Sequence, residues 1–527
     1  MTDLIPTDFA ARVNALEPNI AGIHLQLDSI TAAIAALSVR LNQLQRPTAP
    51  PPTPPTNTVR VTTSLGANKT MIGWTSIQNQ DHSATTKAIL ASVSDINNSH
   101  IIGFGANNPI QTVEGGAYDF TYLDSIFGYP TPNAGYFPSS KKMCVTLCGS
   151  PPYMRQPRAG AQYSAPNPMG TPLTGLYDFE PVHWSQAGNF ASMAAAIVTR
   201  YPQITDIHWW NEAKGYYFNT AAAGSVIVPP GSGLPARTGG NRNWIEGMTD
   251  CFNQVRTACK TARSTIRVNG PYLVCRSYTA TPSSDLANGV YPMSLNGPWG
   301  YADKKILLDV MYFLENCVGL DVLIMDVKTS TNDLGDVAAY QWTGHQKLID
   351  WQAWLRQLAT YDSTKYGRAV ANAATLNFWF AEAYSRIPSA VAFTPATHNQ
   401  AVATDAWTLC NYVYHCDIEC WMRWAPEGIT NASGDAAAAH SISLWYDNVA
   451  PTGALTATEA KAVYQNFTTN FPVGTQMYAV ETDDPNISGI ASPTMLCVVS
   501  KSASPANITL NSVVRTLAPY EVAFIAR

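Results

Sequence analysis

The sequence predicts an α/β protein in which a (β/α)8 TIM barrel follows an N-terminal α-helical coiled coil and precedes a C-terminal β-sandwich. Three patterns lead to this prediction: an apolar heptad repeat near the start, a long middle in which β-rich and helical runs alternate, and a tail of short β-rich runs. The expected segments are a coiled-coil oligomerisation stalk over residues 1–46, a Pro-rich linker over 47–57, the barrel over 58–465 and the sandwich over 466–527.

The stalk carries apolar residues whose spacings alternate between three and four. They are Val13, Leu16, Ile20, Ile23, Leu27, Ile30, Ile34, Leu37, Leu41 and Leu44. Isoleucine at both a and d positions favours three or four strands over two, so we expect a homotrimer through residues 13–45. The alternative is an amphipathic helix that packs on its own globular domain. The Pro-rich linker that follows is expected to form a semi-rigid polyproline helix, which spans about 3 Å per residue.

The long middle of the chain alternates between two kinds of run. Strands are expected at 71–74, 101–105, 143–147, 204–209, 266–269, 322–327, 377–380 and 418–424. Helices are expected at 84–97, 122–127, 189–199, 244–261, 304–317, 342–358 and 404–416. This alternation predicts a parallel barrel. After residue 470 only short runs follow, at 477–480, 494–499, 506–510 and 522–525, which is typical of a small sandwich.

Composition excludes several classes of function. Charged residues make up 13% of the 527 residues, the net charge is −5, and no basic run occurs. Binding to nucleic acid or to an anionic membrane is therefore not expected. Since no run of about 18 apolar residues exists, we expect no membrane span.

The start of the chain and its cysteines indicate where the protein is made. Met1-Thr2-Asp3 lacks the basic region of a secretory signal, so we expect synthesis in a reducing cytoplasm. The ten cysteines include no CxxC pair and are expected to be buried free thiols. A disulfide, or a metal near Cys410, Cys416 and Cys420, is the alternative. We expect no metal and no cofactor.

Two glutamates follow predicted barrel strands. Glu212 comes directly after Trp210-Asn211 at the end of the fourth strand, and Glu382 comes after Phe380-Ala381 at the end of the seventh. Catalytic residues of such barrels project from the C-terminal ends of strands. Glycoside hydrolysis needs one carboxyl group on each side of the scissile bond. A single glutamate after a strand is usually a solvated loop residue, but the paired placement favours catalysis.

These two triplets resemble the acid/base and nucleophile signatures of clan A glycoside hydrolases, most of all family 39, the β-xylosidase and α-iduronidase group. Similar stretches occur at 118–124, 150–154, 267–271 and 517–524, so the resemblance covers about residues 60–527. It implies a retaining mechanism with Glu212 as acid/base, Glu382 as nucleophile and Asn211 bound to the 2-hydroxyl of the sugar.

The chain departs from that family at two predicted strand ends. The sixth strand ends in Met325-Asp326, where such enzymes often carry His and Tyr, and Asp326 either binds a sugar hydroxyl or anchors a loop. The second ends in Gly103-Phe104-Gly105, without the Arg that often supports the nucleophile.

Aromatic residues near strand ends are candidate platforms for sugar stacking, with core packing as the alternative for about half of them. The candidate substrate-binding residues, including two polar ones, are Trp74, Tyr153, Trp210, Asn211, Asp326, Trp379, Tyr384, Trp421 and Trp424. His208 is expected to be structural.

The stalk, the spacer and the missing signal together resemble actinobacteriophage minor tail proteins, which join an oligomeric anchor to a glycosidase-like domain. This resemblance implies a virion location in the phage tail, as a fibre or tip protein. The expected partners are other tail proteins and a bacterial envelope polysaccharide. The alternatives are a non-catalytic adhesin that binds a glycan receptor and a purely structural tail protein.

Overall fold

A computed structural model describes most of the chain after the stalk. The chain divides into two compact units, Met1–Pro55 and Thr56–Arg527. The described residues are 57–76, 84–101, 110–111, 114–131, 135, 137–154, 182–212, 243–278, 295–328, 341–358, 368, 371, 376–384, 395–415, 418–424 and 459–527. The predicted stalk lies outside them, as does the linker up to residue 56, so the coiled coil and the trimer stay predictions.

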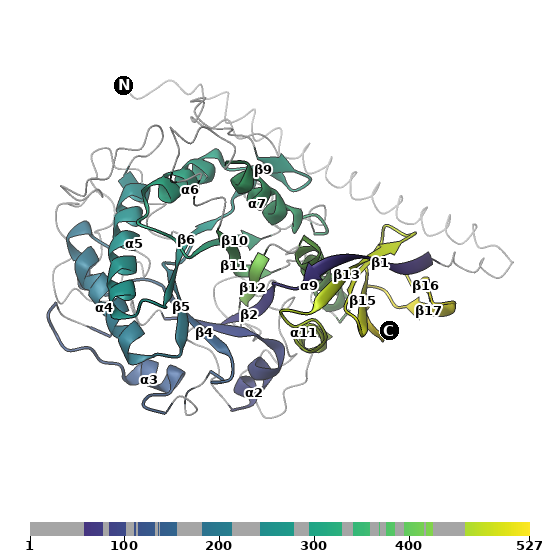
Figure 1. The fold of residues 1–527 in the computed structure, drawn as a ribbon, viewed down its shortest axis with the longest axis horizontal. Coiled ribbons are helices and arrows are strands. Elements are labelled where there is room, and N and C mark those ends of the chain that lie inside the picture. Colours follow the sequence, from purple (N-terminus) through teal and green to yellow (C-terminus); the bar gives the residue numbers. More distant parts are fainter. Residues whose placement is uncertain are drawn as a thin grey trace, which may run out of the picture. The chain divides into compact units, whose positions relative to one another are not determined.

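Eight parallel strands close into a barrel (Figure 1). In order around the barrel they are β2 (Met71–Ser76), β3 (Ile96–His100), β4 (Lys142–Leu147), β5 (Ile204–Trp209), β6 (Arg267–Val274), β10 (Val322–Lys328), β11 (Asn377–Tyr384) and β12 (Ile418–Trp424). Strand β12 pairs in parallel with β2 and closes the ring. The predicted parallel barrel is confirmed.

Helices surround the barrel strands (Figure 1). They are α2 (Ala84–Val93), α3 (Thr121–Phe127), α4 (Ala187–Arg200), α5 (Asn243–Ala262), α6 (Lys304–Asn316), α7 (Gln346–Leu358), α9 (Pro395–His415) and α11 (Glu459–Asn470), with short 3-10 turns at Pro152–Met154 and Trp184–Gln186. Helix α4 buries Phe190, Ala194 and Ile197 at spacings of three and four residues, which is the pattern of a helix with one face on a core. Helix α11 was not expected from the sequence.

Side-chain alternation along the strands separates two cores. Ile207 and Trp209 of β5 join the large cluster shared with the helices. Cys144, Ile324 and Trp379 belong to a second cluster, drawn from seven of the eight barrel strands, which fills the barrel interior. The barrel is therefore packed through its middle, and a substrate can enter only at an end.

The second barrel strand differs from its prediction. It was expected at 101–105, yet β3 runs from Ile96 to His100, and α2 ends at Val93 rather than at residue 97. The strand is Ile-Asn-Asn-Ser-His, and all five side chains are buried. Because its buried side chains are mostly polar, the strand lacks the apolar signal that sequence analysis requires.

A seven-stranded sheet forms the β domain. Its order is β17 (Val513–Leu517), β16 (Ala506–Leu510), β1 (Asn57–Ala67), β13 (Gln476–Thr482), β14 (Ile487–Ala491), β15 (Met495–Ser500) and β18 (Val522–Ala526). Ile508 and Leu517 from one end of this order share a core with Val498 and Ala523 from the other end, as expected of a sheet that folds onto itself. Strand β1, expected in the barrel segment, belongs instead to this sheet because it pairs with β13 and β16.

Smaller features complete the description. A three-stranded sheet comprises β7 (Ser277–Tyr278), β9 (Gly300–Ala302) and β8 (Asn296–Gly297). Nine of the ten cysteines are described, and all nine are buried free thiols, as predicted. No helix in the described ranges is long and apolar enough to cross a membrane. Within the same ranges, no three His, Cys, Asp or Glu side chains gather as metal ligands would.

Candidate active site

Glu212 lies at the C-terminal end of β5, the fourth strand of the barrel. Trp210 and Glu212 both have left-handed backbones, with φ of 60° and 52°. Such a conformation costs a non-glycine residue about 1–3 kcal/mol, and residues that keep it cluster at functional sites. Asn211 between them is buried, whereas Glu212 is partly exposed. The strained turn thus presents one carboxyl group at the rim of the barrel.

Glu382 lies within β11, the seventh strand, because this strand continues to Tyr384 instead of ending at residue 380. The backbone pairs Glu382 with Asp326 of β10. Since all the barrel strands are parallel, the C-terminal ends of β5 and β11 open on the same end of the barrel. The side chains of residues 382–384 are not among those described, so the separation of the two carboxyl groups stays a prediction.

A chain of hydrogen bonds crosses the barrel interior beneath these two positions. His208 of β5 lies 3.4 Å from the Thr146 hydroxyl, and the Asn98 amide donates to Thr146 at 2.9 Å and to Thr75 at 3.1 Å. The Thr75 hydroxyl in turn donates to the carbonyl of Ala381 at 3.4 Å. The chain therefore links the strand that carries Glu212 to the residue directly before Glu382.

His208 is a neutral member of this chain. Burial lowers its pKa to about 3, with smaller contributions from His100 and Arg267. Its ring lies edge-on to Trp379 at 5.3 Å and to Tyr272 at 6.4 Å. A neutral imidazole packed between two aromatic rings supports the interior and carries no charge at neutral pH. This agrees with the structural role expected for it.

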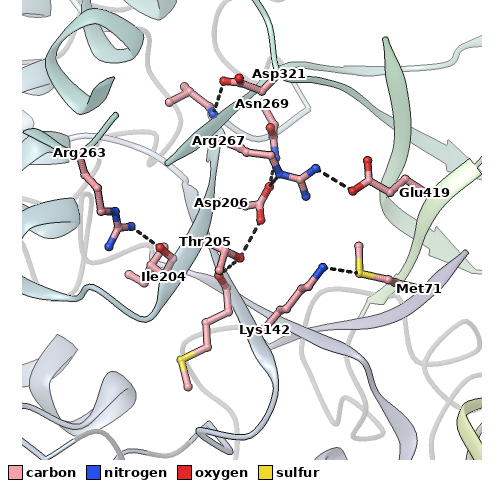
Figure 2. A network of polar contacts seen from close by, with 12 residues as sticks. Met71, Lys142, Ile204, Thr205, Asp206, Arg263, Arg267, Asn269, Asp321 and Glu419 are labelled. Carbon is pink, nitrogen blue, oxygen red and sulfur yellow. Dashed lines mark hydrogen bonds and ion pairs between the residues drawn. The ribbon is translucent and has the colours of Figure 1, made fainter. Parts of the chain in front are cut away.

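An ionic network joins residues near the starts of β5, β6 and β12 (Figure 2). Arg267 pairs with Asp206 and with Glu419, each at 2.7 Å, and Asn269 donates to Asp206 at 3.0 Å. Burial acts to lower the pKa of Arg267, but the two carboxylates outweigh it and raise that pKa. Asp206, Arg267 and Glu419 each lie within the first three residues of their strands, β5, β6 and β12, whereas Glu212 follows the end of β5. The network therefore forms the barrel floor and is no part of the site.

Two of the candidate platforms prove to be core residues. Trp74 packs edge-on against Tyr464 of α11 at 4.9 Å, and Trp421 packs against Tyr464 and Tyr412 of α9. Both indoles lie between the barrel wall and its helices, and both are at most 1% exposed. Their assignment to substrate binding is corrected, because a sugar at the barrel mouth cannot reach the outer face of the wall.

The other candidates divide between the two cores, with Trp379 in the barrel interior and Trp210 and Tyr153 in the cluster shared with the helices. Trp379 lies inside the barrel, with Arg267 4.9 Å from its ring centre. Trp210 stacks on Trp209 and Phe190, and the Tyr153 hydroxyl donates to Gln111 at 2.6 Å. Each of these three aromatic rings is buried, as is Asp326. The side chains of Tyr384 and Trp424 lie outside the described set.

Two interior residues were not singled out from the sequence. His100 ends β3, and its ring lies 6.3 Å from that of Tyr272, whose φ of 55° is also left-handed. His100 was missed because the second strand was placed five residues too late. Tyr272 directly follows the stretch 267–271 that carries the family resemblance, and this proximity was the available signal.

Comparisons with known proteins bear on the fold alone. No family model matches the chain, and no curated protein matches it in sequence. A glucosidase structure from Croceicoccus marinus aligns with a TM-score of 0.50 and 9% identity, covering 89% of this chain and 84% of that one. A GH39 β-xylosidase from Caulobacter crescentus aligns at 0.46 and 11%, covering 87% and 84%. A GH30 endoxylanase from Clostridium papyrosolvens aligns at 0.41 and 12%, covering 89% and 97%. The chain therefore shares its overall fold with the glucosidase structure.

Proposed function

We propose that this chain binds and hydrolyses a glycan of the bacterial cell envelope by a retaining mechanism with two glutamates. The observation that carries the proposal is the placement of Glu212 just after the fourth strand and of Glu382 on the seventh strand of one closed parallel barrel. The left-handed backbone at Trp210 and Glu212 supports it, as does the hydrogen-bonded chain between the two strands.

In the proposed mechanism, Glu382 attacks the anomeric carbon while Glu212 protonates the departing oxygen. Glu212, now a carboxylate, then takes a proton from the water that hydrolyses the glycosyl–enzyme ester. Asn211 holds the 2-hydroxyl of the sugar. A retaining pair requires carboxyl groups about 5–5.5 Å apart, and that separation is expected here.

We further propose that the protein works on a virion, as a tail fibre or tip protein. The support is the heptad repeat over residues 13–44 and the Pro-rich spacer that follows it. A trimeric stalk would display three barrels together, which raises the local concentration of sites at a repetitive cell surface. The partners would be the other tail proteins and the envelope polysaccharide.

The alternative is a glycan-binding adhesin without catalysis. Strand β3 ends in Asn-Asn-Ser-His, so this strand holds no arginine to support the nucleophile. An adhesin would bind the glycan and release no product. A purely structural tail protein would do neither.

Incubation of the full chain with purified envelope polysaccharides, followed by analysis of reducing ends, tests the proposal. We expect product from the unmodified chain and none from Glu382→Gln, while binding to the polysaccharide persists. Glu481→Gln is the matched control, because Glu481 is an exposed glutamate of β13 in the β domain. Clear binding without cleavage by the unmodified chain would establish the adhesin instead.

A further inference from the structure

A pocket lies between α9, α11 and the segment that leads into β18. Its volume is about 440 Å³. Pockets of about 300–1,000 Å³ are typical of small-ligand sites. The polar lining residues are Asn399, Asn466, Tyr520 and Glu521. They come from the outside of the barrel and from the β domain, so the pocket is distinct from the candidate active site.

The pocket lies toward the same end of the barrel as Glu212. Helices α9 and α11 follow β11 and β12, and Asn399 and Ala462 lie within the first two turns of these helices. The far end of α11 reaches the opposite rim, where the Asn68 amide, just before β2, donates to the carbonyl of Phe471 at 2.6 Å. A polymer that leaves the barrel mouth could therefore continue along this side of the molecule.

The chemistry of the walls suits an uncharged polar ligand. Among the described residues, no lysine or arginine lines the pocket, and the carboxylate of Glu521 already accepts from Arg515 and from the backbone of Ala518, each at 2.7 Å. The remaining polar groups are amides and a phenol, which can exchange hydrogen bonds with hydroxyl groups. The Oδ1 of Asn399 is buried and has no hydrogen-bond partner among the described residues.

The aromatic wall is held in place before any ligand binds. Tyr520 has a φ of 56°, and its backbone N–H donates to the carbonyl of Ser502 at 3.0 Å. Its ring stacks on Trp342, with centres 6.3 Å apart and planes 15° apart. A fixed ring costs little entropy on binding, which is a property of preorganised sites.

We propose that this pocket is a second carbohydrate site that binds uncharged sugar units. Flat apolar contact from Tyr520 and Val402 would meet the C–H face of a sugar ring, while Asn399 and Asn466 would meet its hydroxyls. The site would retain the glycan chain while the barrel acts on it, and it does not depend on whether the barrel cleaves.

Calorimetric titration of the full chain with neutral trisaccharides of glucose, xylose, arabinose and mannose tests this site. The titrations use a Glu382→Gln background, so that no ligand is hydrolysed. We expect Ala462→Trp, which fills the pocket, to remove one binding event per chain. Gln465→Trp is the matched control, because Gln465 is also exposed on α11 but does not line the pocket. Asn399→Ala, a smaller change, should weaken the same event about fivefold, the loss of one hydrogen bond.

The outcome separates this site from the proposed hydrolysis. If Ala462→Trp and Gln465→Trp bind every trisaccharide alike, or if no trisaccharide binds at all, the second site is rejected. Release of reducing ends is measured independently on chains with Glu382 intact. If Ala462→Trp loses the binding event while hydrolysis is unchanged, the pocket is supported. If the binding event is present but no chain hydrolyses the glycan, the result counts only against the barrel mechanism.

Discussion

Glu212 has a left-handed backbone conformation, which costs free energy for any residue other than glycine. Its φ of 52° follows the φ of 60° at Trp210, while the Trp210 ring is anchored between Trp209 and Phe190. The packing of the Trp210 indole against these two rings offsets the backbone strain of the turn.

Glu212→Gln should separate substrates by their leaving groups. An aryl glycoside with a strongly acidic phenol needs no protonation, so its hydrolysis should be little changed in the glycosylation step. An alkyl glycoside should lose about 10²–10⁴-fold in kcat/KM, the usual contribution of a general acid. Steady-state kinetics on both substrates measures this, with Glu382→Gln inactive on each. Equal losses on the two substrates would remove Glu212 from the acid/base role.

His208 should make stability depend on pH. Its folded pKa of about 3 lies below the ordinary value of 6.5. Between those values the unfolded chain binds a proton at this position and the folded chain does not, so stability falls as the pH falls. From pH 7.5 to 5 the loss should be about 2 kcal/mol for this group. Denaturant unfolding of the unmodified chain and of His208→Gln at both pH values measures it. An identical pH dependence in the two proteins would contradict the assignment.

Between elements, one buried ion pair joins the barrel wall to its helices. Arg423 of β12 lies 2.8 Å from Asp405 of α9, and the Tyr464 hydroxyl of α11 donates to Asp405 at 2.7 Å. The Arg423 side chain is fully buried and that of Asp405 is 4% exposed. The pair ties together β12, α9 and α11, and the two helices also wall the proposed carbohydrate pocket.

Asp405→Ala should destabilise the fold strongly. The substitution leaves Arg423 charged and buried without this partner, which typically costs about 3–5 kcal/mol. Asp483→Ala is the control, because the Arg60–Asp483 pair has a similar distance of 2.9 Å but half-exposed side chains. Exposed pairs contribute at most about 1 kcal/mol. Thermal unfolding monitored by circular dichroism compares the two variants. Similar melting temperatures would show that burial does not set the strength of the Arg423 pair.

Across the whole molecule, β1 links the two ends of the globular unit. It precedes the barrel in sequence, yet it pairs antiparallel with β13 and parallel with β16. The predicted stalk and linker therefore lead directly into the β domain. A truncation that removes the stalk must keep residue 57, where β1 begins, or it will open this sheet.

The full chain should be trimeric and a chain that begins at Thr56 should be monomeric. The reason is isoleucine at both a and d positions of the repeat over residues 13–44. Multi-angle light scattering of both chains measures their mass, and the shortened chain should keep its melting transition because β1 is intact. If both chains are monomeric, the heptad repeat packs on its own globular domain. If both chains are trimeric, the contact between subunits lies in the barrel or the β domain.

The order of the barrel strands could be predicted because their apolar runs are long and their turn signals clear. Strands β5 and β12 match their predicted bounds at both ends. The positions of Glu212 and Glu382 on strands four and seven followed from this order, since chain direction alone determines at which end of a parallel strand a residue lies. Strand β3 could not be found the same way, because its buried residues are polar.

Sequence alone therefore determined the barrel, the strands that carry the two glutamates and the stalk as a prediction. Tertiary structure decided the rest. The alternation of side chains along a strand distinguishes two faces but does not determine which face points to the barrel axis. Trp74 and Trp421 were therefore predicted to bind sugar, whereas in the structure they pack against α9 and α11. Strand β1 belongs to the sheet of the β domain because its backbone N–H and C=O groups pair with β13 and β16, more than 400 residues away in the sequence. Such contacts arise only when the chain is folded, and no local pattern encodes them.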